Sequence, residues 1–194
     1  LKTIFPTPYT GLHEWTMSYA IKLDRNKDNQ AVLSPDFYSR VTADGALQMK
    51  VGETDDPKAF AKTKLQPGKW YYIAWVYKNQ HVRCYINGVL DNEFDVPKVE
   101  TFTKLNMSWG AFEGYVREIR LYDKALTAFQ VADNLYIETP DNPDLLFYAP
   151  LDKKTGIKDV SKKQNTIKVY VPGSGDGTEY DQSLITWSNE KFPE

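Results

Sequence analysis

The sequence predicts an all-β fold in which two antiparallel sheets stack face to face, together with one short helix. Segments rich in β-branched and aromatic residues recur, with turn signals at intervals of about ten residues, which is typical of a two-sheet sandwich. Aromatic residues make up 14% of the 194 residues, including 13 tyrosines. Tyrosine suits a half-buried pleated surface, so this composition also favours sheets.

The strand-like segments are separated by turn dipeptides such as Asp44-Gly45, Pro67-Gly68 and Asn87-Gly88. The predicted strands are Trp15–Leu23, Val32–Leu33, Phe37–Val41, Ala46–Val51, Lys58–Leu65, Trp70–Tyr77, Val82–Asn87, Leu105–Trp109 and Tyr115–Tyr122. A chain of this length can bury a substantial core without disulfides or metals.

One helix is predicted, beginning near Thr127. Thr127 and Gln130 form the T-x-x-Q pattern of a capping box, in which each side chain bonds to the backbone N–H of the other residue. Leu126 can pack against Val131 as a hydrophobic staple. Ala128–Leu135 then supplies about two turns of helix.

The chain divides into a main body, residues 1–138, and a C-terminal extension, residues 139–194. The proline-rich stretch TPDNPD at residues 139–144 marks the boundary. Beyond it, LLFYAPLD and NTIKVYV read as strands, but the extension is too short and too polar to hold a core alone. We therefore expect it to add strands to the sandwich formed by the main body.

The charge balance argues against a nucleic-acid partner. The formal net charge is −2, from 24 basic and 26 acidic residues, so no overall field attracts a polyanion. One lysine-rich region is interrupted by Asp152 and Asp159, and aromatic residues do not alternate with its lysines as in a nucleic-acid groove. We interpret this region as a solvated loop surface. Its lysines are Lys153, Lys154, Lys158, Lys162 and Lys163.

The cysteine and the histidines indicate neither a disulfide nor zinc. Cys84 is the only cysteine, and its apolar strand neighbours predict a buried thiol. His13 and His81 lack a nearby cysteine or second histidine, which argues against zinc. No apolar run approaches about 18 residues, so no transmembrane segment is predicted. Because the chain begins at Leu1 without a leader, we expect a mature or trimmed part of a longer protein.

Residues 70–87 read as an antiparallel hairpin with a loop at residues 78–81, so that Tyr77 faces Val82. Side chains alternate along a strand, so one face is wholly apolar or aromatic and is predicted to lie in the core. The core-facing set is Tyr71, Ile73, Trp75, Tyr77, Val82, Cys84 and Ile86. The opposite set is Trp70, Tyr72, Ala74, Val76, Arg83, Tyr85 and Asn87. This second face is amphipathic and fits either a partly covered sheet or a ligand platform.

Three segments match, in order, the pattern of a known family. The patterns W-x-h-I-A-x-x-Y and l-Y-h-N-G stand in residues 70–77 and 84–88. The pattern G-x-h-x-E-h-R-h-Y-x-x-A-L-[ST] stands as GYVREIRLYDKALT at residues 114–127, and EWTMSYAIKLD at residues 14–24 resembles the early core strand of the family. Over roughly residues 12–136 the chain resembles a laminin-G-like, concanavalin A-like domain, which implies a two-sheet jelly-roll sandwich.

The resemblance is to the bacterial branch of this family, found in multi-module proteins that handle glycans. It implies an exported protein at the cell surface, in the periplasm or outside the cell. The segment 144–165 is similar to the stretch that normally opens such a domain, with the pattern Y-x-L-D…G…D-x-S-x-x-x-N, but here it comes last. Either the domain is circularly permuted or a second repeat is cut short. The first alternative is preferred, because an exposed sheet edge is costly and a complementary strand is available.

The resemblance extends to β-glucanases, so we searched for a catalytic carboxylate pair. Retaining glycosidases need two carboxyl groups about 5–5.5 Å apart, which a strand supplies through E-x-D-x-E. Glu93 and Asp95 fit the first two positions, but Pro97 occupies the third. Glu113 and Glu118 would lie on opposite faces of a regular strand. We therefore expect no catalytic residues and no enzyme activity.

Two loops were considered for calcium, which relatives of this fold often bind at a rim. DRNKDN at residues 24–29 begins like an EF-hand loop, but Asn29 and Pro35 occupy the positions that require glycine and glutamate. GSGDGTEYD at residues 173–181 is the other acidic loop. Neither loop is specific enough to assign as a metal site, and no cofactor is expected beyond a structural calcium ion that the resemblance allows.

The function predicted from these observations is a non-catalytic carbohydrate-binding module. Sugar rings stack their C–H faces on tryptophan and tyrosine, and their hydroxyls need polar partners. The predicted partners are an oligosaccharide or polysaccharide and other modules of a longer chain. The alternative is a protein-binding scaffold module, and a glycoside hydrolase ranks third. The predicted sugar-binding residues are Tyr72, Arg83, Tyr85, Asn87 and Trp109; Tyr38, Tyr180 and Trp187 are further aromatic candidates, whereas Trp70 and Tyr85 also match scaffold positions of the family pattern.

Overall fold

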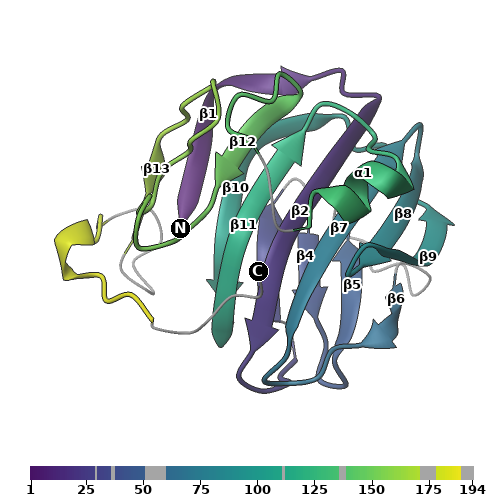
Figure 1. Cartoon of the computed structure of the whole chain (residues 1–194), viewed down its shortest axis with the longest axis horizontal. Coiled ribbons are helices and arrows are strands. Elements are labelled where there is room, and N and C mark those ends of the chain that lie inside the picture. Colours follow the sequence, from purple (N-terminus) through teal and green to yellow (C-terminus); the bar gives the residue numbers. More distant parts are fainter. Residues whose placement is uncertain are drawn as a thin grey trace.

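The computed structural model describes residues 1–28, 30–35, 38–50, 60–110, 112–135, 139–170 and 178–188. Within these residues the strands form two antiparallel sheets that stack as a sandwich (Figure 1). The seven-stranded sheet has the order β13 (Ile167–Lys168), β1 (Lys2–Thr10), β10 (Thr101–Gly110), β3 (Gln30–Pro35), β4 (Tyr38–Val41), β5 (Ala46–Lys50) and β6 (Phe60–Lys64). The six-stranded sheet has the order β12 (Leu145–Ala149), β11 (Gly114–Tyr122), β2 (Glu14–Leu23), β7 (Trp70–Lys78), β8 (His81–Ile86) and β9 (Val89–Asp95).

The predicted strands correspond to β2 to β8, β10 and β11, with some predicted ends outside the described residues. Two strands of the main body were missed. β1 contains Pro6 and Pro8, which normally argue against a strand. Its pairing with β10 shifts register between Ile4 and Tyr9, so the prolines lie in an irregular stretch of the ladder. β9 was missed because its sequence, VLDNEFD, is mostly polar.

The core lies between the two sheets and is rich in aromatic rings. Trp15 on β2 stacks on Tyr77 of β7 with ring centroids 5.1 Å apart, and it meets Phe102 of β10 edge to face at 5.3 Å. The indole Nε1 of Trp15 donates to the carbonyl of Val99 at 2.7 Å. The only polar atom of this buried ring therefore has a partner, as a buried indole requires.

The predicted hairpin register is confirmed. Tyr77 pairs with Val82, and Trp75 pairs with Cys84. The inward side chains of β7 and β8 are buried in the main core, including the Cys84 thiol, except that Tyr71 is only partly buried against it. Burial raises the pKa of Cys84, so this thiol packs as a small apolar group.

The helix α1 (Ala128–Asp133) begins as predicted. Gln130 N donates to Thr127 Oγ1 at 3.2 Å, and Thr127 N donates to Gln130 Oε1 at 3.0 Å, which confirms the capping box. The helix ends at Asp133, short of the predicted end at Leu135. Neither described helix, α1 or the 3₁₀ turn η1 (Gln182–Leu184), is long and apolar enough to cross a membrane.

The C-terminal extension contributes to both sheets. β12 pairs with the edge of β11, and β13 pairs with β1 in the opposite sheet. The stretch between β12 and β13 is held by the Asp159 carboxylate, which accepts bonds from the backbone N–H groups of Tyr148, Ser161 and Asn165 at 3.0, 3.0 and 2.7 Å. The D-x-S-x-x-x-N pattern therefore forms a buried turn that fixes this stretch against β12.

Candidate functional site

The outer face of the six-stranded sheet, which points away from the core, has a covered part and an open part. The covered part lies beneath α1 and the segment before it, near β7 and β8 (Figure 1). Val131 of α1 packs there with Leu126, as the staple predicted. The cluster of buried apolar and aromatic side chains comprises Ala20, Tyr72, Ala74, Val76, Tyr85, Tyr122, Leu126, Val131, Leu145 and Tyr148.

Two of the predicted sugar-binding rings lie in this covered part. Tyr72 is 5% exposed and Tyr85 is 2% exposed, so neither ring is presented to solvent. The prediction overlooked that the polypeptide after β11 folds back over its own sheet. At these two positions the amphipathic face is a covered sheet and not an open platform.

The other predicted site residues do not assemble around these rings. Arg83 is half-buried and lies opposite Glu93 of β9. Asn87 is exposed in the turn after β8, with φ 51°, and its Oδ1 accepts from Tyr72 N at 2.9 Å, so the side chain supports the turn. Trp109 belongs to β10 in the other sheet, where its backbone pairs with Ala31.

A charged network is buried within the covered part. Arg120 Nη2 donates to Glu118 Oε2 at 2.5 Å, and Tyr148 Oη donates to the same carboxylate oxygen at 2.8 Å. Arg120 Nη1 donates to Tyr72 Oη at 3.1 Å and to the carbonyl of Asn134. Tyr72 Oη in turn donates to Ser18 Oγ at 2.8 Å. The network joins β11 to β2, β7, β12 and the end of α1.

The protonation states of this network follow from its surroundings. Burial by itself would lower the pKa of Arg120, but Tyr72, Tyr122 and Glu118 outweigh burial and raise it. Burial raises the pKa of Tyr72 and of Tyr148. The guanidinium is therefore charged and both phenols keep their protons at neutral pH, which matches the donor roles that the distances give. With Arg120 inaccessible to solvent, we assign the network to structure.

The open part of the outer face begins with a row of side chains across three neighbouring strands. Trp70 of β7 pairs with Lys22 of β2, which pairs with Tyr115 of β11. The Trp70 and Tyr115 ring centroids are 6.2 Å apart with the planes tilted by 50°. Lys22 Nζ lies 5.6 Å from the Tyr115 ring centroid, a cation–π contact. Opposite residues of antiparallel strands share a face, so this row projects outward.

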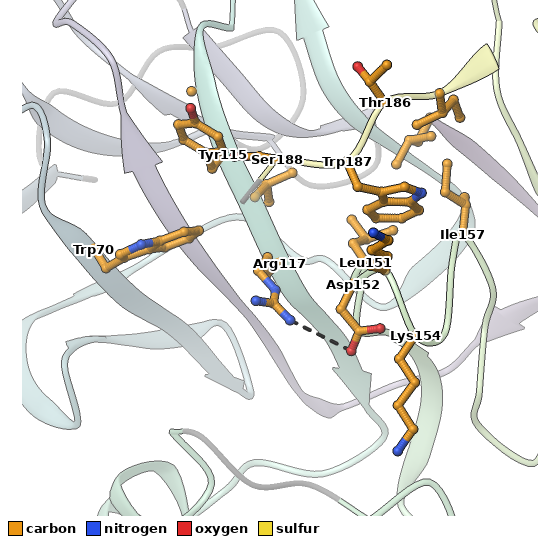
Figure 2. Close-up of a pocket in the computed structure, with 15 residues that line it drawn as sticks. Trp70, Tyr115, Arg117, Leu151, Asp152, Lys154, Ile157, Thr186, Trp187 and Ser188 are labelled. Carbon is orange, nitrogen blue, oxygen red and sulfur yellow. Dashed lines mark ion pairs between the residues drawn. The ribbon is translucent and has the colours of Figure 1, made fainter. Parts of the chain in front are cut away.

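A pocket of about 690 Å³ lies beside this row, and Figure 2 shows its lining side chains. Its volume lies within the range of roughly 300–1,000 Å³ usual for small-molecule sites. The walls come from Trp70, from residues 114–117 of β11, from the turn at residues 151–154 with Ile157, and from residues 185–188. Segments distant in the sequence therefore meet at this outer-face pocket.

Aromatic rings and charged groups alternate around the outer-face pocket. In the view of Figure 2, Arg117 projects between Trp70 on one side and Trp187 and Asp152 on the other. Trp70, Tyr115 and Trp187 are each partly exposed. An apolar wall with a few converging polar groups is the usual design of a ligand site.

Asp152 organises the turn that forms one wall. Its Oδ1 accepts from Thr155 N and from Thr155 Oγ1, each at 2.6 Å, and its Oδ2 lies 3.7 Å from Arg117 Nη2. Burial opposes ionisation of Asp152, but the bonds from Thr155 and the charge of Arg117 outweigh it and lower its pKa. The carboxylate is therefore ionised and already engaged by the protein.

Only some of the residues that line this pocket could be predicted from the sequence. Alternation along GYVREIR places Tyr115 and Arg117 on one face, and Trp187 had been named as an aromatic candidate. The pairing of β2 between β7 and β11, which aligns Trp70 with Tyr115, could not be inferred from the hairpin alone. The lysine-rich turn also could not be placed at this face from the sequence, because its position depends on where the C-terminal extension packs against the main body.

The carboxylates weighed for catalysis have other partners. Glu93 and Asp95 are exposed on β9 and both contact His81, at 3.4 and 2.8 Å. Glu113 pairs with Arg25 at 2.7 Å, and Glu118 belongs to the buried network.

Polar residues of the two candidate calcium loops contact other protein groups. Asn26 Nδ2 donates to the carbonyl of Leu65, Glu179 pairs with Lys168, and Asp181 caps Ser183 N at 2.9 Å. Asp176 lies outside the described residues. Among the described residues, no group of three or more histidine, cysteine or acidic side chains is placed to hold a metal ion.

Comparison with known proteins defines the family. The model of the concanavalin A-like lectin/glucanases superfamily matches residues 3–132, so the chain belongs to this family. No curated protein sequence matches significantly.

Solved structures share the fold at low sequence identity. A proposed carbohydrate-binding protein from Bacteroides ovatus superposes with a TM-score of 0.68 at 20% sequence identity. The aligned region covers 84% of this chain and 53% of the Bacteroides ovatus chain. The chain thus spans about half the length of that protein. A native heptameric SAP-like pentraxin from Limulus polyphemus gives a TM-score of 0.52 at 19% identity, covering 68% and 73% of the two chains. The binding domain of botulinum neurotoxin serotype C1 gives a TM-score of 0.52 at 10% sequence identity, and the aligned region covers 66% of this chain and 37% of the neurotoxin chain.

Proposed function

We propose that this chain is a non-catalytic carbohydrate-binding domain and that the sugar binds in the outer-face pocket. The observation that carries the proposal is the placement of Trp70, Tyr115 and Trp187 around Arg117 in one partly exposed hollow. Indole and phenol rings offer apolar surfaces to the C–H faces of a pyranose, and the guanidinium supplies five donors for its oxygens. Family membership and the proposed carbohydrate binding of the Bacteroides ovatus protein support the assignment.

The proposal moves the sugar site away from Tyr72 and Tyr85. Both rings belong to the same outer face, but α1 and the segment before it cover them. The uncovered continuation of that face carries Trp70 and Tyr115 instead.

Binding is tested by titrating the protein with a panel of neutral and acidic oligosaccharides and polysaccharides, followed by tryptophan fluorescence and calorimetry. Trp70→Ala and Trp187→Ala are expected to weaken binding about tenfold each, since a ring contact contributes roughly 0.5–1.5 kcal/mol beyond its buried area. Phe129→Ala is the matched control, because Phe129 is 77% exposed on α1 and does not line the pocket. Equal losses in all three variants would contradict the pocket as the site.

The absence of catalysis is tested in the same samples. Glycans that bind are incubated with the protein, and reducing ends are measured over time. We expect no release above the rate of a buffer control. Steady release that persists in purified protein and is lost in Arg117→Ala would assign a hydrolase instead.

A protein-binding module is the second candidate function. The large apolar side chains exposed on β9 and α1 are Val89, Leu90 and Phe129. Exposed apolar groups of this kind often mark an interaction site. No response to any sugar of the panel would favour this candidate over carbohydrate binding.

The proposal also places the chain outside the cytoplasm, as one module of a longer exported protein. Its support is the similarity to the bacterial glycan-handling branch and the partial coverage of the Bacteroides ovatus protein. Detection of the native protein in secreted or surface fractions of its source cells tests this placement.

A further inference from the structure

We infer that the outer-face pocket selects an acidic saccharide, one that bears a carboxylate or a sulfate group on a sugar ring. This inference rests on the proposed carbohydrate binding and names the class of sugar. Among the described residues that line the pocket, three side chains are cationic, namely Arg117, Lys153 and Lys154, and one is a carboxylate, that of Asp152. Lys22 adds a fourth cation beside Tyr115. The local excess of positive charge contrasts with the net charge of −2 of the whole chain.

The carboxylate of Asp152, which belongs to the described lining of the pocket, is already engaged by the protein. Asp152 accepts two bonds from Thr155 and faces Arg117, so little of its charge is available to bind sugar hydroxyls. Its main effect is to shape the turn, which is closed further by Gly156 N donating to Asp152 O at 2.7 Å. The pocket therefore presents donors and cations to a ligand much more than it presents acceptors.

The two lysines are available for a ligand. Lys153 and Lys154 are exposed, and within the described part of the chain no carboxylate lies within 4.0 Å of either ammonium group. They follow Asp152 directly in the turn that Thr155 and Gly156 hold. A lysine on a braced turn loses less freedom on binding than one on a loose loop.

Arg117 is suited to the acidic group itself. Its guanidinium forms an ion pair with Asp152, with Nη2 and Oδ2 3.7 Å apart, and lines the pocket. Arginine forms paired, nearly planar contacts with carboxylates and sulfates, which a lysine cannot imitate. Because Arg117 projects between Trp70 and Trp187 (Figure 2), an acidic group on Arg117 would leave its sugar ring next to an indole.

The same residues explain why the sequence indicated a solvated surface here. Lys153 and Lys154 were grouped with Lys158, Lys162 and Lys163, and no aromatic residue was near them in the chain. Folding brings Trp70, Tyr115 and Trp187 to the first two lysines only. Lys162 and Lys163 do not line the pocket, which makes them a natural control.

The test compares each acidic glycan with its own neutral form, by calorimetry at low salt on the intact chain. Polygalacturonate is paired with its carboxyl-reduced derivative, and dextran sulfate with unmodified dextran, so the two pairs separate carboxylate from sulfate recognition. We expect at least one acidic form to bind about tenfold or more tightly than its neutral form, since hydrogen bonds between a guanidinium and a charged group are stronger than those to a neutral hydroxyl. This preference should fall as salt rises.

The variants assign the preference to residues. The double variant Lys153→Gln/Lys154→Gln should weaken acidic-glycan binding about tenfold, while Lys162→Gln/Lys163→Gln, with the same change in net charge, should leave it within about twofold. Equal losses in both double variants would overturn the inference. Equal affinity for acidic and neutral forms would also overturn it while leaving carbohydrate binding intact, whereas no binding of any glycan overturns both.

Discussion

At the scale of single residues, Arg117 and Arg120 point to the same face of β11. They are three positions apart, so in a regular strand they would point to opposite faces. The pairing with β2 explains this, because Arg117 lies opposite Ala20 and Arg120 lies opposite Ser18. One additional residue on β11 is thus accommodated in a bulge, where Glu118 has φ 56°. The bulge turns Arg120 into the covered part of the face and leaves Arg117 in the open part.

Glu118→Gln is expected to lower the free energy of unfolding by about 3 kcal/mol, because the variant leaves the buried Arg120 guanidinium without its counter-charge. Denaturant unfolding followed by tryptophan fluorescence measures the loss. Glu113→Gln is the matched control, since Glu113 pairs with Arg25 at the surface and its loss should lower stability far less than the loss of Glu118. Equal losses would show that the buried pair is not stabilising.

His81 provides a test at a solvent-exposed position. The hydrogen bond that the imidazole of His81 donates to the Asp95 carboxylate is the largest cause of the raised pKa of His81. Stability from this contact is fully present below the usual histidine pKa of about 6.5, and it is lost as the pH rises through the folded-state pKa. In Asp95→Asn, an NMR titration should show the pKa of His81 shifting back toward its usual value.

The same variant should lose more stability near pH 5 than near pH 9, where the imidazole is neutral in both folded and unfolded chains. Asp141→Asn, an exposed carboxylate without contact to His81, is the control for the change in net charge. A stability difference that is independent of pH would contradict the role given to the Asp95 contact.

At the scale of elements, the stretch between β12 and β13 shows that an irregular segment can be as firmly placed as a strand. It contains almost no regular ladder of backbone hydrogen bonds. Side-chain carboxylates accept from its backbone N–H groups instead. Asp152 closes the first turn through Thr155, and Asp159 closes the second through Ser161 and Asn165. The wall of the outer-face pocket formed by residues 151–154 and Ile157 lies within this stretch.

Asp159→Ala removes an acceptor shared by three buried backbone N–H groups and the Asn165 side chain. We expect a loss of about 2–3 kcal/mol and faster proteolysis of the extension, since each buried donor left unsatisfied costs roughly 1–3 kcal/mol. The comparison is Asp181→Ala, where the lost carboxylate caps Ser183 N at an exposed 3₁₀ turn. Unchanged proteolysis in Asp159→Ala would contradict the bracing role.

At the scale of the whole molecule, the features that could be predicted from the sequence are those set by residues close together in the chain. Alternation along residues 70–87 predicted both faces of the hairpin and its register, and T-x-x-Q predicted the start of α1. The bulge at Glu118, the return of the chain over Tyr72 and Tyr85, and the strand order of β7, β2 and β11 depend on contacts between distant segments. The predicted sugar site failed to assemble for that reason, since a face of a hairpin does not reveal what later residues will cover.

The extension is expected to be indispensable for folding. A chain ending at residue 138 loses β12, including Phe147 and Leu146, which are buried in the main core, and Tyr148 of the charged network. Burial of each large apolar side chain contributes roughly 1.5–3 kcal/mol, so their loss is comparable to a total stability of about 5–15 kcal/mol. We expect no cooperative thermal transition by circular dichroism. A truncated chain that melts cooperatively near the temperature of the full chain would show that residues 1–138 are a domain by themselves.

Because β12 completes one sheet and β13 completes the other, the order of synthesis constrains assembly. A nascent chain that has emerged only to α1 carries two unpaired edges, on β11 and on β1, that can bind to neighbouring nascent chains. Residues 145–168 cover the edge of β11 and the first residues of β1 only after they have left the ribosome. Slow translation of this stretch would therefore prolong the interval in which the protein is prone to aggregate.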